Sequence, residues 1–511
     1  MTTRSVLTEA VTDHRLAHRI EAVFGLAPDD GALEYEGVWT TWAEIARYAD
    51  RINTICRQYG PDHGTGIGVL LRNRPVHVAV LLGVLLSGRC LVVVNPSRGD
   101  ERTRDDVAAL HLPVVIGESD DLDTLVGRPP GTTTVTVADV ADEPEVVAAT
   151  DRSMPSDNRP GTAVLMLTSG TTGPPKRVEL TYDMLAHSVL GPAGDDTPPD
   201  RLSSGVAIVN APLVHVGGVY RTLQCIVAAR PFALLPRFEL AAWVDAIRRH
   251  RPLAASLVPT ALRMVLHSDL TRDDLSSLRV VTSGTAPLSA EDADAFTDKF
   301  GIPVLTSYAA TEFGGGVAGW NLADHRKYWS SKRGSVGRAE PGSLLRVVDE
   351  SGHEVDTDTV GLLEVKPAQR GPMAGWMRTT DLARIDADGF VWIHGRSDQA
   401  IIRGGFKIMP DDIRVALETH PAVENAAVVG RPDDRLGETP VGMVECRADA
   451  RVTPAELADY LSTRLARYEI PTEIAVVDSI PRTPSGKADL GAVRSRLNKL
   501  PTFRLRPPWR H

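Results

Sequence analysis

The sequence predicts an α/β protein in which parallel and mixed sheets carry helices on their faces. Residues 206–307 alternate short apolar strands with helices, and strands separated by helices form parallel sheets. Beyond Gly334 the pattern changes to short strands and turns, which predicts a β-rich subdomain. A small α/β module begins near Gln399. The length of 511 residues exceeds what one core supports, so two or more domains are expected.

The N-terminal part is expected to contain a β-α-β unit preceded by an amphipathic helix. The expected elements are a helix over 41–56, a strand over 66–71, a helix over 76–86 and a strand over 90–94. Residues 116–160 are acidic and contain several prolines, so they are expected to form peripheral surface. A buried strand over 162–167 then leads into a loop, and a helix is expected over 182–190.

The central alternation predicts five strands and four helices. The strands are expected at 206–210, 231–235, 254–258, 278–282 and 303–307, and the helices at 219–228, 240–250, 260–267 and 289–300. Further on, two strands over 382–385 and 390–394 flank an Asp-Gly turn, which predicts a hairpin.

Composition excludes several classes of function. The net charge of −10 disfavours nonspecific binding of nucleic acid. The four cysteines have no CxxC spacing, so they predict neither a zinc site nor a disulfide framework and fit a cytoplasmic location. The N-terminus lacks the apolar core of a signal peptide. The most apolar run, residues 76–94, is interrupted by Ser-Gly-Arg and is expected to be a buried helix and strand, so no membrane span is predicted.

A loop of small hydroxyls and glycines follows the strand that ends at Leu167. It reads Thr168, Ser169, Gly170, Thr171, Thr172, Gly173, Pro174, Pro175 and Lys176. Glycines let the backbone approach a ligand closely, and backbone N–H groups, hydroxyls and a lysine suit a polyphosphate. No Gly-Lys-Ser/Thr ends the loop, so it is not a Walker motif. The stretch resembles the signature loop of the adenylate-forming superfamily, which includes acyl-CoA synthetases, peptide-synthetase adenylation domains and beetle luciferases.

Further motifs similar to those of this superfamily follow in its order between residues 160 and 490. The resemblance implies a large N-terminal AMP-binding domain over residues 1–398 and a small mobile α/β domain over 399–511, with a hinge at Asp398. ATP would lie between the two domains. Hinges are a few loop residues that absorb large backbone changes. The acyl-CoA synthetase branch, whose members are AMP-dependent acid–CoA ligases, is the closest in pattern.

Two motifs predict the pocket for the acid substrate. The segment from Pro212 to Gly218 resembles Pro-Leu-Phe-His-x-x-Gly, with Val214 in place of phenylalanine. A Phe-Asp segment would stand here in an enzyme for α-amino acids, and its absence argues against such substrates. The turn that begins at Ser283 resembles Gly-Ala-Ala-Pro-Leu. The resemblance assigns to the acid pocket His215, Val216, Gly217, Ser283, Gly284, Ala309 and Ala310.

The remaining motifs of the large domain predict the nucleotide site. Tyr308 to Glu312 resembles Tyr-Gly-x-Thr-Glu, with Ala309 in place of glycine. The resemblance implies that Tyr308 stacks on adenine, Thr311 binds the α-phosphate and Glu312 holds Mg²⁺, which prefers oxygen ligands. Besides the loop from Thr168 to Lys176, the expected ATP contacts are Gly284, Thr285, Ala286, Tyr308, Ala309, Thr311, Asp381, Arg396 and Lys487.

Two motifs of the small domain predict the two halves of the reaction. Arg403, Gly404, Gly405, Phe406 and Lys407 resemble the loop that lines the tunnel for CoA. Residues 481–490 match the terminal lysine motif, and Lys487 is expected to be catalytic together with Thr311 and Glu312. The implied activity joins a carboxylic acid to ATP to form an acyl-adenylate, from which CoA then displaces AMP.

The first hypothesis is therefore an acid–CoA ligase of bacterial secondary or lipid metabolism, with ATP, Mg²⁺ and CoA as its cofactors. The second is a stand-alone adenylating enzyme that transfers the acyl group to a separate carrier protein or an amine. The third is a non-catalytic nucleotide-binding protein, which would be expected to have lost Lys487 or Glu312, although both are present. The identity of the acid and the oligomeric state, a homodimer included, stay open.

Overall fold

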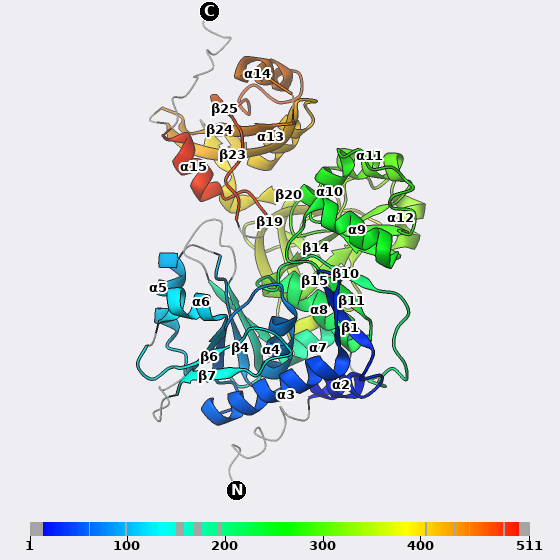
Figure 1. Cartoon of the computed structure of the whole chain (residues 1–511). Coiled ribbons are helices and arrows are strands. Elements are labelled where there is room, and N and C mark those ends of the chain that lie inside the picture. The colour runs from blue at the N-terminus through cyan, green and yellow to red at the C-terminus, as the bar shows by residue number, and fades with distance from the viewer. Residues whose placement is uncertain are drawn as a thin grey trace, which may run out of the picture.

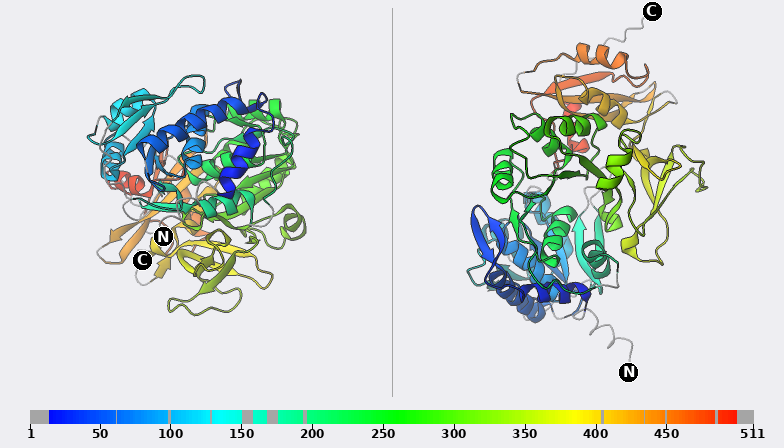
Figure 2. Two further views of the ribbon diagram at one scale, coloured as in Figure 1. Left: turned by 90° about the horizontal axis from the view of Figure 1, so that it is seen from below. Right: turned by 90° about the vertical axis from the view of Figure 1, so that its right-hand side faces the viewer.

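The computed structural model describes residues 14–60, 62–97, 100–127, 129–149, 158–167, 176–192, 196–403, 406–433, 435–448, 450–483 and 486–499. The N-terminal sheets lie at one end of the molecule, and the elements of residues 401–497 lie at the other end above strands β19 (Met377–Ile385) and β20 (Val391–Arg396) (Figure 1). A view from the side shows the β-rich sheet of residues 344–396 projecting from the middle (Figure 2). No helix among the described residues is long and apolar enough to cross a membrane.

A seven-stranded sheet organises the N-terminal part. Its strands, in spatial order, are β7 (Glu145–Ala148), β6 (Thr133–Thr136), β5 (Val114–Gly117), β3 (Gly66–Leu70), β4 (Cys90–Val94), β8 (Thr162–Leu167) and β9 (Arg177–Thr181). The five inner strands are parallel, and the two edge strands run antiparallel to their neighbours. Antiparallel β9 carries the chain back from the end of β8, so the predicted phosphate loop connects these two strands.

Helices α3 (Trp42–Tyr59) and α4 (Pro75–Leu86) cover this sheet. Thr41 and Glu44 form a reciprocal capping box that starts α3, which satisfies backbone donors at the helix start. Every residue of α4 after Pro75 is buried, because the helix lies between the sheet and α3. A Cβ at Gly83 would stand 2.5 Å from the Ala49 carbonyl oxygen, so this glycine permits the close approach of the two helices.

The prediction of peripheral surface over residues 116–160 was wrong in part. Strand β6 is buried at Thr133, Thr134 and Val135 and extends the large sheet. Its threonines are polar but β-branched, and the hydroxyl of Thr132, just before the strand, donates to the Leu112 carbonyl oxygen at 2.8 Å. Composition hid this strand because β-branched threonine is favoured in sheets whatever its polarity.

Two smaller sheets complete the α/β part. The first has the order β10 (Ala207–Val209), β11 (Phe232–Leu234), β1 (Gly31–Tyr35) and β2 (Val38–Thr41). The second has the order β12 (Ala254–Ser256), β13 (Val280–Ser283), β14 (Val304–Ala310), β15 (Gly315–Gly319) and β16 (Arg338–Ala339). Strands β12, β13 and β14 are parallel as predicted, and β15 and β16 add antiparallel edges.

The helices of this region agree with the predicted alternation. They are α7 (Tyr182–Leu190), α8 (Val216–Val227), α9 (Leu240–His250), α10 (Pro259–Leu266) and α11 (Ala290–Phe300), and α12 (Leu322–Tyr328) follows them. Two further helices of the N-terminal part are α2 (Arg15–Phe24) and α5 (Asp100–Leu110). Helix α8 starts at Val216, three residues before the predicted start. The pair Gly217-Gly218 disfavours a helix locally, but packing overrides this preference, because a Cβ at Gly218 would stand 2.1 Å from the Pro212 carbonyl oxygen.

The C-terminal part contains two further sheets. The first is antiparallel and comprises β17 (Leu344–Val348), β18 (Gly361–Lys366), β19 (Met377–Ile385) and β20 (Val391–Arg396), which include the predicted hairpin. The second comprises β21 (Ile401–Arg403), β22 (Phe406–Ile408), β23 (Val423–Asp433), β24 (Gly437–Cys446) and β25 (Glu473–Val477). Helices α13 (Pro410–Glu418) and α14 (Pro454–Ser462) cover one face of the second sheet, and α15 (Leu490–Leu497) covers the other. This second sheet with its helices is called the C-terminal module below.

Candidate nucleotide and acid site

The residues predicted to hold the adenosine part of ATP lie together. The phenol of Tyr308 donates a hydrogen bond to the Asp381 carboxylate, although 73 residues separate them. Burial raises the pKa of both groups. Asp381 stands opposite Arg396 in the pairing of β19 with β20. The Arg396 guanidinium donates to the Thr380 hydroxyl at 2.9 Å and pairs with Asp398 at 2.6 Å.

The Thr311–Glu312 pair lies in a single 3₁₀ turn, Thr311–Phe313, between β14 and β15. Gly314 ends the turn with a left-handed backbone, φ 79°, which glycine adopts without steric cost. Its carbonyl oxygen accepts hydrogen bonds from Tyr220 at 2.5 Å and Ser188 at 2.7 Å. These bonds tie the turn to α7 and α8 and hold Glu312 at a fixed position, exposed to solvent.

Lys487 projects from the C-terminal module toward this turn. A short hairpin presents it, in which the Thr483 N–H donates to the Lys487 carbonyl oxygen at 2.7 Å and the Gly486 N–H donates to Thr483 at 2.8 Å. The side chain is solvent-accessible, yet its ammonium is surrounded by protein, and this burial lowers its pKa. Glu312 and Asp381 pull that pKa upward through their charges, so both carboxylates lie within electrostatic reach of the ammonium. The module thus brings its lysine to the predicted ATP contacts.

The site suits Mg²⁺ that arrives with ATP better than a resident metal. The described residues contain no cluster of three or more His, Cys, Asp or Glu side chains that could hold a metal ion. Mg²⁺ is commonly bound by one or two carboxylates together with substrate phosphates. An exposed Glu312 beside a lysine fits that arrangement, because the phosphates would supply the remaining oxygen ligands.

The residues predicted for the acid pocket come from the start of α8 and from the neighbouring strands β13 and β14. His215 precedes α8 with extended backbone. Ser283 is buried at the end of β13, and a Cβ at Gly284 would stand 2.9 Å from the Ser307 hydroxyl of β14. Thr285 has φ 70°. A β-branched residue with positive φ is a strained outlier, and such strain concentrates at functional sites.

The two glycines at the start of α8 have different surroundings. A Cβ at Gly217 would meet no atom within 4 Å, whereas one at Gly218 would overlap the Pro212 carbonyl group. We therefore expect Gly217→Ala to keep or raise thermal stability by up to about 1 kcal/mol, because alanine favours a helix interior. Gly218→Ala is expected to destabilise the protein. Thermal unfolding tests both.

The same pair of variants tests the acid pocket. If Gly217 lines it, Gly217→Ala narrows the space for the acid and raises KM for bulky acids more than for small ones. An unchanged ratio of kcat/KM between bulky and small acids would contradict the assignment of Gly217 to the pocket. Gly218→Ala serves as the structural control.

Parts of two predicted loops lie outside the described residues. These are Thr168, Ser169, Gly170, Thr171, Thr172 and Gly173 of the phosphate loop, and Gly404 and Gly405 of the CoA loop. Lys176 is exposed at the start of β9. Arg403 donates to the carbonyl oxygens of Tyr468 and Ile470 at 2.6 and 3.2 Å. Phe406 is 55% exposed and stacks on Tyr468 with ring centroids 4.4 Å apart.

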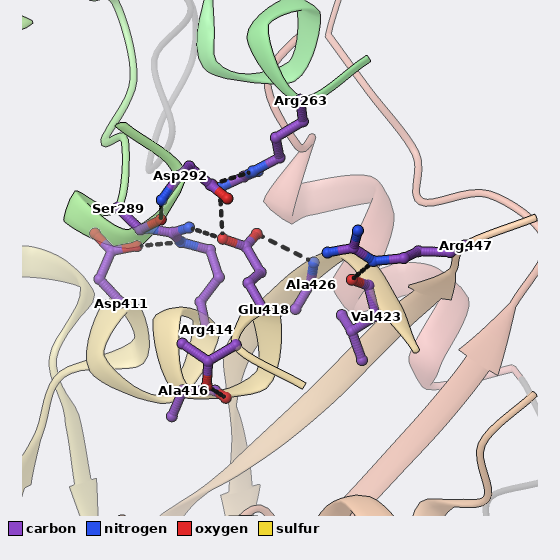
Figure 3. Close-up of polar contacts among 11 residues, drawn as sticks. Arg263, Ser289, Asp292, Asp411, Arg414, Ala416, Glu418, Val423, Ala426 and Arg447 are labelled. Carbon is purple, nitrogen blue, oxygen red and sulfur yellow. Dashed lines mark hydrogen bonds and ion pairs between the residues drawn. The ribbon is translucent and has the colours of Figure 1, made fainter. Parts of the chain in front are cut away.

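A network of charges joins the C-terminal module to helices α10 and α11 (Figure 3). The Arg263 guanidinium of α10 pairs with Asp292 of α11 at 2.7 Å and with Glu418 of α13 at 2.8 Å. Arg414 also holds Glu418 at 2.7 Å. Arg263 and Glu418 are 8% and 7% exposed, so this contact is shielded from water and salt.

Sequence reasoning missed several residues that position the site. Tyr220 and Ser188 clamp Gly314, and the Gln369 amide donates to the Gly316 carbonyl oxygen at 2.7 Å. Arg263 likewise carries no motif. These side chains act through contacts distant in sequence, and Tyr220 alone had a local signal, because it stands one turn beyond Val216 on the same helix.

Comparison with known proteins identifies the family. Residues 21–375 match the AMP-binding enzyme family, and residues 413–487 match the AMP-binding enzyme C-terminal domain. The chain is 29% identical to 4-coumarate–CoA ligase 1 of Oryza sativa subsp. japonica over 92% of this chain and 89% of that one. It is 29% identical to indoleacetate–CoA ligase of Aromatoleum aromaticum over 94% and 97%. Feruloyl-CoA synthase of an Amycolatopsis species is also 29% identical, over 92% and 96%.

Solved structures show the same fold. ATP-bound MatB from Rhodopseudomonas palustris has a TM-score of 0.79 at 24% identity and covers 94% of this chain and 99% of its own. The o-succinylbenzoate–CoA synthetase of Bacillus subtilis with its acyl-adenylate has a TM-score of 0.76 at 24% identity over 95% and 99%.

The fold and the site define an adenylate-forming enzyme with a small C-terminal domain. The chain belongs to the AMP-binding enzyme family. The predicted superfamily, its acid–CoA ligase branch, the α/β fold class and the AMP-forming ligase chemistry are thereby confirmed.

Proposed function

We propose that this enzyme activates a carboxylic acid with ATP and transfers the acyl group to CoA, with the residue roles set out below. The observation that carries these roles is the position of Lys487. Its ammonium reaches from the C-terminal module to the electrostatic neighbourhood of Glu312 and Asp381. The names of the relatives, which are CoA ligases for aryl-containing acids, support CoA as the acceptor.

In the first half-reaction a carboxylate oxygen attacks the α-phosphorus of ATP, and pyrophosphate leaves. Both reactants are anions, so positive charge must offset their repulsion. Lys487 supplies a charge to the site, and Thr311 donates a hydrogen bond to the α-phosphate. Mg²⁺ held by Glu312 would neutralise phosphate charge. Asp381 accepts hydrogen bonds from the ribose hydroxyls, and Tyr308 forms the wall for adenine.

In the second half-reaction the CoA thiol attacks the acyl carbonyl, and AMP leaves. Lys487 is not needed for this step, and the loop of Arg403, Phe406 and Lys407 takes its place. We assign the boundary to residue 398, with one domain over 1–398 and the other over 399–511. Asp398 lies in a 3₁₀ turn, Ser397–Gln399, between β20 and β21, where rotation would move the whole module.

One assay tests the function and separates the acceptors. Purified protein is given ATP, Mg²⁺ and each acid of an aliphatic and aryl panel, and pyrophosphate release is measured. The active acid is then tested for AMP formation with CoA, a purified acyl carrier protein or an amine. CoA is the expected acceptor. Transfer only to a carrier protein or an amine would overturn this part of the proposal. A cytoplasmic location and a homodimer are expectations that cell fractionation and light scattering can test.

The lowered pKa of Lys487 predicts a pH dependence. An ammonium is charged below its pKa. The rate of acyl-adenylate formation should therefore be constant near neutral pH and fall as the pH rises through the pKa of Lys487, which lies below the ordinary value of 10.5. The profile of kcat/KM reports groups of the free enzyme. Thiolysis of supplied acyl-adenylate should lack this alkaline loss. Lys487→Arg keeps its charge at higher pH and should remove the loss, and a profile unchanged in that variant would contradict the assignment.

A further inference from the structure

Glu340 places a carboxylate against two glycines of β15. It lies in the bend between β16 and β17. A Cβ at Gly316 would stand 2.7 Å from Glu340 Oε1, and one at Gly319 would stand 3.4 Å from the same oxygen. The absence of side chains at both positions makes room for the carboxylate over this strand.

This carboxylate lies on the strand face predicted to contact the acid. Gly316 pairs directly with Ala309 of β14, and Gly319 pairs with Ser307. Residues directly opposite in a pair of strands project to the same face. Ala309 is exposed and belongs to the predicted acid pocket. Glu340 therefore lies beside Ala309, on the side from which the acid would approach.

No described residue satisfies this carboxylate. Its backbone N–H donates to the Val317 carbonyl oxygen, and its own carbonyl oxygen accepts from the Ser343 N–H, but its side chain makes neither a hydrogen bond nor an ion pair with any described residue. Burial raises the pKa of Glu340 above the ordinary value for a carboxyl group. Glu340 is half-buried, and a carboxylate that loses part of its water without gaining a protein donor is unfavourable, so a ligand that supplies an N–H donor would bind here more tightly than one that does not.

We propose that Glu340 recognises an amino group on the acid substrate, so that the enzyme acts on amino-substituted carboxylic acids. This inference rests on the proposed function. Ala309 lies two residues before Thr311, where the reacting carboxylate meets ATP, and a strand rises about 3.4 Å per residue. The amino group would thus stand roughly 7 Å or more from the reacting carboxyl. That distance excludes α-amino acids and agrees with the missing Phe-Asp segment, and it suits aminoaryl acids and ω-amino acids.

Arg221 is the alternative residue for recognising a polar group of the acid substrate. It lies on α8 one turn beyond Gly217, is accessible to solvent and has no carboxylate partner among the described residues. Its guanidinium donates to the Thr282 hydroxyl at 3.1 Å and to the Gln224 amide oxygen at 3.5 Å. A second carboxylate on the substrate would favour Arg221. We favour Glu340, because Arg221 already has polar partners in Thr282 and Gln224, whereas the Glu340 side chain has no partner among the residues that the structure describes.

Matched acids and three variants test the proposal. The aryl series is 4-aminobenzoate, 4-hydroxybenzoate, 4-methylbenzoate and terephthalate, and the aliphatic series is 6-aminohexanoate, hexanoate and adipate. Pyrophosphate release gives kcat/KM for the wild type and for Glu340→Leu, Glu340→Gln and Arg221→Met. In each series the wild type should have a kcat/KM for the amino-substituted acid that is about 10-fold or more above that for the methyl-substituted or unsubstituted acid. This is the usual range for a hydrogen bond to a charged group.

The variants should differ in their preference for amino-substituted acids. Glu340→Leu removes the preference, and Arg221→Met leaves it unchanged. Glu340→Gln keeps the shape of the side chain, so it should preserve thermal stability while lowering the preference for cationic 6-aminohexanoate. A preference that survives in Glu340→Leu overturns the proposal. So does a preference for terephthalate or adipate that Arg221→Met abolishes. Absence of pyrophosphate release with every acid would contradict the proposed function together with this inference.

Discussion

Replacing Lys487 by alanine should lower acid-dependent ATP–pyrophosphate exchange by about 10²–10³-fold, the usual effect of removing one preorganised electrostatic stabiliser. The reason is the repulsion between carboxylate and α-phosphate, against which the lysine supplies a full charge. The same variant should thiolyse supplied acyl-adenylate at close to the wild-type rate, because that step develops no such repulsion. Rapid-quench measurements of each half-reaction provide the readout.

Lys499→Ala is the matched control, because Lys499 belongs to the same module but follows α15 and lies outside the lysine hairpin. It should leave both half-reactions unchanged. Equal losses of exchange and thiolysis in Lys487→Ala would show that the lysine serves both steps, or that its hairpin is needed for folding. Thermal unfolding separates these two outcomes, since the side chain is exposed and its loss should not change the melting temperature.

Much of the fold could be predicted from the sequence because its signals are local. The apolar run of α4 and the strands β3 and β4 appear as expected, since burial on all sides leaves a continuous apolar pattern. Strand β6 was missed because threonines carry its buried face. The start of α8 was missed because the pair Gly217-Gly218 disfavours a helix locally, whereas the close approach of Pro212 to Gly218 depends on packing that the local pattern does not show.

The sequence predicted the motif residues of the site but not the residues that hold them in position. The motif residues Tyr308, Asp381 and Lys487 come together, although no local pattern relates them. The sequence contains no signal for Ser188, whose hydroxyl holds the turn after Glu312, because a hydrogen bond to a distant carbonyl leaves no periodic pattern. Glu340 was missed for the same reason, because its position beside the predicted acid pocket depends on the pairing of β14 with β15.

Replacing Arg263 by methionine should slow acyl-adenylate formation by roughly 100-fold. Arg263 is the cation that stands between Asp292 and Glu418 (Figure 3). Without it these two acids face each other across the boundary between α11 and the C-terminal module, and the orientation that delivers Lys487 becomes less favourable. Breaking a buried ion pair costs about 3–5 kcal/mol, and the low end applies because Arg414 still holds Glu418.

The effect should be confined to the first half-reaction, because the orientation required for thiolysis does not need this contact. The double variant Arg263→Met with Glu418→Gln should lose less than the sum of the two single losses, since residues in one network are not additive. Arg248→Met is the matched control: it removes an arginine that pairs with Asp274 while 58% exposed, and exposed pairs contribute about 0–1 kcal/mol. Equal slowing of both half-reactions in Arg263→Met would show that the network stabilises the fold as a whole and does not select the orientation in which Lys487 meets ATP.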